Sequence, residues 1–246
     1  MYQKLLSILL LLVTVVCCAG TPSAKHTKAE GKADAVHRAD SVRHAADSVR
    51  YLQLTDDDYR AVAGELGISV ACIKAVVSIE AGAKAEGFNK DHTPLINFDV
   101  SMFRKFARQR GITTTNYHKS HAVVFAAPNT TKYGSYQAAQ YARLMSAITI
   151  DTVAALEGTF WGMFQIGGFN WKVCGCESVQ QFVFRMAWSE REQLELFAAF
   201  ITSRNLVRYL RERNWSAFAL RYNGPGYKRQ RYDERMAVAY RKFGGK

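Results

Sequence analysis

The sequence predicts a mainly α-helical domain with one small β region. Hydrophobic residues make up 48% of the 246 residues and charged residues 22%, which is typical of a globular chain with one or two cores. From residue 54 onward, apolar residues recur mostly at the three- and four-residue spacing of helices. Only residues 83–100, which include Gly87, Asn89 and Pro94, are typical of a loop or a short hairpin.

Residues 1–18 have the pattern of an export signal: one positive charge, an almost unbroken apolar run over residues 5–16, and small residues after it. This run is shorter than the about 20 residues that cross a bilayer, so a membrane anchor is the less favoured interpretation. Two processing routes stay open. The cysteine pair resembles a lipobox, which would make a lipidated Cys18 the membrane-anchored first residue, whereas plain cleavage would fall near Ala19 or Gly20. Both routes place the mature chain outside the cytoplasm, in the periplasm or cell envelope, with secretion as the alternative.

Residues 19–53 are expected to form a polar tether. They contain six Lys/Arg and four Asp/Glu, and a five-residue sequence that starts at Ala39 recurs seven residues later at Ala46. Two heptads with valine as their apolar residue are too few to predict a coiled coil. We therefore expect a solvated, partly helical segment that precedes a domain over residues 54–246.

The domain is expected to begin with two short helices. Thr55 and the aspartates after it have the pattern of a capped N-terminus, so a helix is predicted over Asp56–Leu66 with Gly67 as its stop. Ser69 is the next N-cap candidate, and the second helix is predicted over Val70–Ala81 with a glycine after it.

The remaining helices are predicted from periodicity. A basic helical turn or two is expected over Phe103–Arg110, followed by an irregular segment over residues 111–134. Further helical segments are expected over residues 135–156, 178–186, 189–212, 215–222 and 231–243.

Glu80 is the first candidate catalytic residue. Ile73, Val76, Val77 and Glu80 follow the i, i+3, i+4, i+7 spacing, so the carboxyl group shares the apolar face of its helix. It also lies in the last turn, where the helix dipole disfavours a negative charge, and both effects raise a carboxyl pKa. A glutamate that is protonated near neutral pH can act as a general acid. The alternatives are a frayed helix end that turns Glu80 to solvent, or a buried ion pair with a partner such as Arg104.

Asp99 is the second candidate. If the preceding apolar run is extended, Asp99 points to the same side as Asn97 and away from Phe98. A glycosidase needs two carboxyl groups, one that protonates the leaving oxygen and one that acts as base, nucleophile or charge stabiliser. An apolar site for Glu80 and a polar site for Asp99 would supply that difference. The alternative is an ordinary N-cap of the following helix.

Several segments together carry a family resemblance. The most specific is WGMFQI at residues 161–166, followed by GFN at 168–170; the second is FALRYNGPGY at 218–227, followed by Tyr232-Asp233. On these segments, residues 54–246 resemble the bacterial and phage N-acetylmuramidases of the lysozyme-like superfamily, and Glu80 occupies the place of their catalytic glutamate. Residues 140–144 and 190–194 also match. The resemblance implies a lysozyme-like α+β fold with a small β-hairpin region and a catalytic cleft.

The resemblance implies cleavage of the β-1,4 bond between N-acetylmuramic acid and N-acetylglucosamine in peptidoglycan, with Glu80 as general acid. It implies no metal or organic cofactor. Sugar rings pack on aromatic faces and bond to amides, although core packing is the alternative for the aromatic residues. The expected substrate-binding residues are Trp161, Gln165, Tyr222, Asn223 and Tyr227.

The chain departs from the family near the second carboxyl group. Relatives usually have Leu-Phe-Glu-Arg-His where this chain has Asn97 to Ser101. The departure leaves the general acid in place and leaves the role of Asp99 open. Glu157, on the helix before the WGMFQI segment, is expected to be structural.

Three functions therefore compete: a muramidase, a lytic transglycosylase on the same fold in which one glutamate does both acid and base work, and a non-catalytic peptidoglycan-binding lipoprotein. The net charge of +12 fits an anionic partner. Residues 204–246 contain twelve Lys/Arg and three Asp/Glu, a local excess of nine positive charges. A nucleic-acid partner is disfavoured, because the sequence has an export signal and no zinc-finger, OB or RNA-recognition pattern.

The cysteines outside the export segment are Cys72, Cys174 and Cys176. An odd number does not form a disulfide framework, and the spacing of Cys174 and Cys176 is not that of a zinc site. Packed thiols, or a disulfide from Cys72 to one of the other two, are the expected states.

Overall fold

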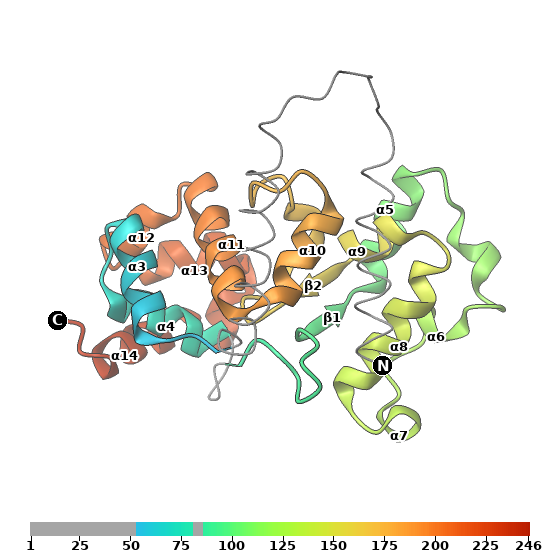
Figure 1. Cartoon of the computed structure of the whole chain (residues 1–246), viewed down its shortest axis with the longest axis horizontal. Helices are drawn as coiled ribbons and strands as arrows, with labels where there is room; N and C mark the ends of the chain where they lie inside the picture. Colours follow the sequence, from blue (N-terminus) through green and yellow to red (C-terminus); the bar gives the residue numbers. More distant parts are fainter. Residues whose placement is uncertain (1–52, 81–85) are drawn as a thin grey trace, which may run out of the picture.

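The computed structural model describes residues 53–80 and 86–246, so the predicted export signal and nearly all of the predicted tether lie outside the described residues. Helices form most of the domain, and a small antiparallel sheet lies between two helical groups (Figure 1). In the described residues no single helix is long and apolar enough to cross a membrane, and one bent pair of helices passes that test on length and composition.

The first helical group joins the two ends of the domain. The predicted helix over Asp56–Leu66 is confirmed as α3, with the Thr55 capping box at its start and Gly67 at a φ of 60° after it. The next helix, α4, runs over Val70–Glu80 and packs along α14, Tyr232–Lys242. Helix α13, Trp215–Asn223, contacts α14 in turn and is followed by the short helix η3, Pro225–Gln230. The second and the last helix of the domain are therefore neighbours.

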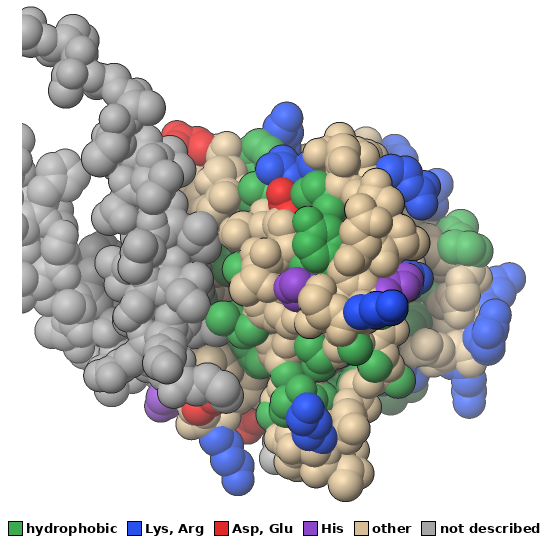
Figure 2. Space-filling view, turned by 90° about the vertical axis from the view of Figure 1, so that its right-hand side faces the viewer, with side chains coloured by type: hydrophobic (Ala, Val, Ile, Leu, Met, Phe, Trp, Pro, Cys, Tyr) green, Lys and Arg blue, Asp and Glu red, His purple; other side chains and the backbone are tan. Residues whose placement is uncertain are grey.

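The second helical group lies on the other side of the sheet in Figure 1. The predicted run over 135–156 is two helices, because Asp151 accepts a hydrogen bond from Ala154 N at 2.7 Å and starts a new one. The segment predicted as irregular, 111–134, contains three short helices. Figure 2 faces this side of the molecule. The helices are α5 (Val100–Gln109), η1 (Thr114–Tyr117), α6 (Ala122–Phe125), α7 (Thr130–Tyr133), α8 (Tyr136–Ile148) and α9 (Thr152–Glu157).

The sheet has three strands, β1 (Ile96–Phe98), β2 (Thr159–Trp161) and β3 (Ile166–Gly167), in that order. One small sheet was expected near residues 88–100, but two of its strands come from the WGMFQI region instead. Strands of two or three residues are too short for an alternating pattern to stand out in the sequence. Helix α8 holds β1: Gln140 Oε1 accepts from Phe98 N at 3.3 Å, and Arg143 donates to Phe98 O at 3.1 Å.

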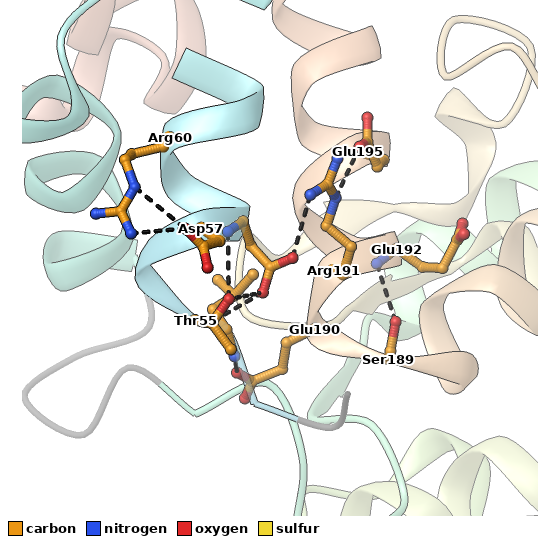
Figure 3. A network of polar contacts seen from close by, with 10 residues as sticks. Thr55, Asp57, Arg60, Ser189, Glu190, Arg191, Glu192 and Glu195 are labelled. Atoms are coloured by element: carbon orange, nitrogen blue, oxygen red, sulfur yellow. Dashed lines mark hydrogen bonds and ion pairs between the residues drawn. The ribbon is translucent and has the colours of Figure 1, made fainter. Parts of the chain in front are cut away.

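The remaining helices are η2 (Gly168–Asn170), α10 (Val179–Trp188), α11 (Glu190–Ser203) and α12 (Val207–Arg211). The predicted helix over 189–212 is thus interrupted, and Asn205 in the break has a φ of 55°. An ion pair joins α11 to α3: Arg191 contacts Asp58 at 3.1 Å, and it also contacts Glu195 of its own helix. Figure 3 shows Arg191 and Glu195.

The three cysteines are buried and unpaired. Cys72 donates to Leu210 O at 3.5 Å. The three cysteines are therefore packed thiols in this structure, and Cys72 forms no disulfide with either of the other two. Burial raises the pKa of the Cys174 thiol to about 12, which keeps it protonated and unreactive at neutral pH.

Candidate active site

Glu80 is the last residue of α4 and is half-buried against the end of α13. Asn223 Nδ2 donates to Glu80 Oε1 at 3.1 Å. Burial raises the pKa of Glu80 to about 7, although the hydrogen bond from Asn223 and the charge of Arg235 both lower it. A large fraction of the carboxyl group is therefore protonated at neutral pH, as a general acid requires. Neither the solvent-exposed helix end nor the ion pair with Arg104 is found.

Asn223 stands where α13 ends, because Gly224 follows it with a φ of 80°. Its amide nitrogen donates a hydrogen bond to Glu80, whereas its Oδ1 is buried and accepts no hydrogen bond from the described residues. A buried carbonyl oxygen without a partner is costly in a folded protein, so a group that binds here gains by donating to it. Asn223 is thus suited to contact both the acid and a bound molecule.

Tyr222, which precedes Asn223 in α13, bonds to the WGMFQI segment. Its hydroxyl donates to Phe164 O at 2.9 Å, and its ring stacks on Phe218 with ring centres 5.4 Å apart. Burial and, after it, the nearby charge of Glu80 raise the pKa of Tyr222 well above its usual value. The hydroxyl therefore stays protonated and keeps α13 in place beside the turn of the sheet.

Gln165 lies in the turn between β2 and β3 with a φ of 47°, and its Nε2 donates to Gly162 O at 2.8 Å. Its half-buried side chain lines a cavity of about 490 Å³, which Tyr222 also lines. The structure thus brings four of the predicted site residues to one region: Glu80, Gln165, Tyr222 and Asn223.

Trp161 and Tyr227 are not placed as sugar faces. Trp161 is 2% exposed, and its ring nitrogen donates to Leu156 O at 3.1 Å. Its ring therefore packs in the core, which was the alternative to sugar binding. Tyr227, in η3, is 6% exposed. A ring enclosed by protein cannot present its face to a sugar, and the expectation for these two residues is corrected accordingly. Glu157 is structural as predicted, since it accepts from Trp171 Nε1 at 3.0 Å.

Asp99 is the N-cap of α5, which was the alternative to a catalytic role. Its Oδ1 accepts from Ser101 N at 2.7 Å, Ser101 Oγ at 2.5 Å and Met102 N at 3.1 Å. Burial alone would raise the pKa of Asp99, but these hydrogen bonds and the charge of Arg143 together lower it. The two carboxyl groups therefore differ in the direction that the sequence predicted, with Asp99 ionised and Glu80 largely protonated.

Two buried polar residues of α11 were missed as part of the site. Gln193 accepts from Met163 N at 2.8 Å and donates to Met186 O at 2.9 Å, and Glu190 accepts from Gly87 N at 2.7 Å and Leu54 N at 2.9 Å (Figure 3 shows Glu190). They hold Gly87 and the turn of the sheet on one helix. The sequence contained an indication of their burial, because Glu190 and Gln193 share an apolar helical face with Leu194 and Phe197, just as Glu80 shares one with valines.

In the described residues no three His, Cys, Asp or Glu side chains gather where they could hold a metal ion. The chemistry that Glu80 and Asn223 offer is that of a carboxyl group with a raised pKa beside an amide.

Comparison with known proteins shows the family of the chain. The family model of N-acetylmuramidase, Muramidase, matches residues 69–244. Among solved structures, the crystal structure of the Burkholderia AP3 phage endolysin is 32% identical, with a TM-score of 0.65 over 78% of this chain and 71% of that chain. No curated protein gives a significant match. The mainly α, lysozyme-like fold is thereby confirmed. The chain belongs to the N-acetylmuramidase family and is a lysozyme-type glycoside hydrolase that acts on peptidoglycan.

Proposed function

We propose that the protein hydrolyses the β-1,4 bond between N-acetylmuramic acid and N-acetylglucosamine, with Glu80 as the general acid. The observation that carries the proposal is the burial of Glu80, which raises its pKa to about 7 beside Asn223. A protonated Glu80 gives its proton to the glycosidic oxygen as the bond from that oxygen to the sugar carbon breaks.

The same carboxyl group can complete the reaction. Once ionised, Glu80 keeps the hydrogen bond from Asn223 Nδ2 and can take a proton from an attacking water, whose oxygen forms the new bond to the sugar carbon. That proton restores the starting state of Glu80, so the reaction balances as hydrolysis. Asn223 Oδ1 is suited to accept from the water or from an acetamido N–H. Gln165 and Tyr222 are the other residues that we place at the sugar.

We propose that Asp99, which is ionised and lies next to the sheet, stabilises the positive charge that develops on the sugar during bond cleavage. Asp99→Asn tests this, because asparagine keeps an oxygen that caps α5 and removes only the charge. A lower rate with unchanged stability would support the catalytic role, and an unchanged rate would leave capping as its function.

A lytic transglycosylase is the second candidate. It is favoured by the hydrogen bonds that engage Asp99 in capping, since they leave Glu80, whose pKa is raised, to act as both acid and base. In that reaction the 6-hydroxyl of muramic acid replaces water.

The test is digestion of purified peptidoglycan followed by mass spectrometry of the product ends. Reducing ends indicate hydrolysis, and 1,6-anhydro ends indicate transglycosylation. Glu80→Gln should abolish both, while Glu212→Gln, an exposed acid, is the matched control. A wild-type protein that binds peptidoglycan and releases nothing would instead support the non-catalytic binding function.

Charge is proposed to concentrate the enzyme on its substrate. Residues 100–150 contain seven Lys/Arg and no Asp/Glu, and they form the side of the molecule in Figure 2, where basic side chains are spread over the surface. Peptidoglycan stem peptides carry carboxylates, so this attraction should weaken as salt is added.

Export and lipidation at Cys18 also remain proposals, because residues 1–18 lie outside the described residues. Mass spectrometry of the N-terminal peptide of the mature protein tests both proposals. A diacyl-modified Cys18 would support membrane anchoring, and an unmodified N-terminus near Ala19 or Gly20 would support release by plain cleavage.

A further inference from the structure

A cavity of about 490 Å³ lies where the turn of the sheet meets the ends of α11 and α13. Three phenylalanines, Phe160, Phe169 and Phe200, form much of its wall. Two arginines, Arg204 and Arg221, also line it, and no acidic residue does. The cavity therefore combines apolar walls with a local excess of positive charge.

Both guanidinium groups are exposed and lack an acidic partner in the described part of the chain. Arg204 donates to Asn170 Oδ1 at 3.3 Å, and Arg221 donates to its own helix at Ala217 O, also at 3.3 Å. Asn170 is 7% exposed and donates to Gly167 O at 3.3 Å, so a buried amide orients Arg204. An arginine has five N–H donors in a planar fork that matches a carboxylate, and most of these donors are unused here.

The cavity and the catalytic carboxyl group contact consecutive residues at the end of one helix. Tyr222 lines the cavity, and Asn223 donates to Glu80. A ligand in the cavity would therefore contact the same end of α13 that contacts Glu80. In peptidoglycan, the group that branches from muramic acid beside the glycosidic bond is a peptide stem, which carries carboxylates and aliphatic side chains.

We propose that this cavity binds a carboxylate of the peptide stem through Arg204 and Arg221, and so makes the enzyme prefer glycan strands that carry stems over bare strands. The inference rests on the proposed function for its substrate. The phenylalanine walls suit the aliphatic side chains of the stem, and the two guanidinium groups suit its carboxylates.

The test measures binding with the Glu80→Gln protein, which leaves the strands uncut. The probes are soluble glycan strands in three forms: with native stems, with stem carboxylates converted to amides, and with stems removed by an amidase. We expect native strands to bind on the order of 10-fold more tightly than the other two, as two partly exposed charge contacts allow. Adding Arg204→Gln and Arg221→Gln should remove this difference, and the corresponding lysine variants should keep part of it.

Arg241→Gln, which removes an exposed charge outside the cavity, is the control and should leave the preference intact. Equal binding of native and amidated strands would overturn the proposal. So would an arginine variant that weakens binding to all three forms alike. A wild-type enzyme that cuts none of the strands would overturn the proposed function alone, because the binding comparison does not depend on catalysis.

Discussion

Replacing Glu80 by glutamine should stabilise the protein at high pH and leave it unchanged at low pH. Glutamine has nearly the same shape and keeps the oxygen that accepts from Asn223 Nδ2, but it cannot ionise. The substitution therefore removes only the cost of holding a negative charge in a poorly solvated place. Catalytic residues often carry a cost of this kind, because the environment that tunes their chemistry opposes folding.

The size of the effect follows from the pKa. Burial raises the pKa of Glu80 from 4.5 to about 7, a difference of about 2.5 units. At 1.36 kcal/mol for each unit, the free energy of unfolding of the variant should exceed that of the wild type by about 3 kcal/mol when Glu80 is ionised. Because the folded state binds the proton more tightly, the difference is near zero below about pH 4.5, grows between about pH 4.5 and 7, and is complete above that range.

Urea unfolding followed by tryptophan fluorescence, at about pH 4 and about pH 8.5, measures this difference. Glu212→Gln is the control, because it makes the same chemical change at an exposed carboxyl group. A stability difference for Glu80→Gln that is the same at both pH values would refute the account of a desolvated acid.

Three further predictions concern Asn223, Asp99 and Gln193. The rate of peptidoglycan cleavage should fall as the pH rises above about 7, because Glu80 loses its proton. Asn223→Ala should move this fall to higher pH, because the hydrogen bond from Asn223 favours the ionised form of Glu80. A pH–rate profile of the variant that matches the wild type would contradict this. Asp99→Ala should lower the free energy of unfolding by about 1 kcal/mol through loss of the α5 cap, and Asp99→Asn should restore most of it, as urea titrations can show. Gln193→Leu should cost about 2–4 kcal/mol, because Met163 N and Met186 O are left buried without partners, and a melting temperature equal to that of the wild type would be the contrary result.

Local patterns predicted the helices well because their causes are local. The Thr55 capping box and Gly67 set both ends of α3 within a few residues of chain. The apolar spacing around Glu80 likewise indicated which side of α4 would be buried, and with it the direction of the pKa shift. The breaks before α9 and α12 were missed, because Asp151 and Asn205 interrupt runs whose apolar spacing continues across them.

The sheet and the surroundings of the site depend on contacts between distant residues. Trp161 was expected at the sugar, but pairing with Ile96, 65 positions earlier, turns its ring into the core. Asp99 was a plausible second catalytic group until the position of α5 showed its oxygen bonded to Ser101 and Met102.

The sequence by itself determined the helices, the acidic residue on an apolar face and the family to which they belong, because helix formation and capping act over a few residues. Only the tertiary structure decided which amide meets Glu80, which aromatic rings are enclosed and which arginines line a cavity. These arrangements depend on residues that are distant in the sequence. Asn223 and Glu80, for example, are 143 positions apart, and they meet only once α4, α13 and α14 have packed together.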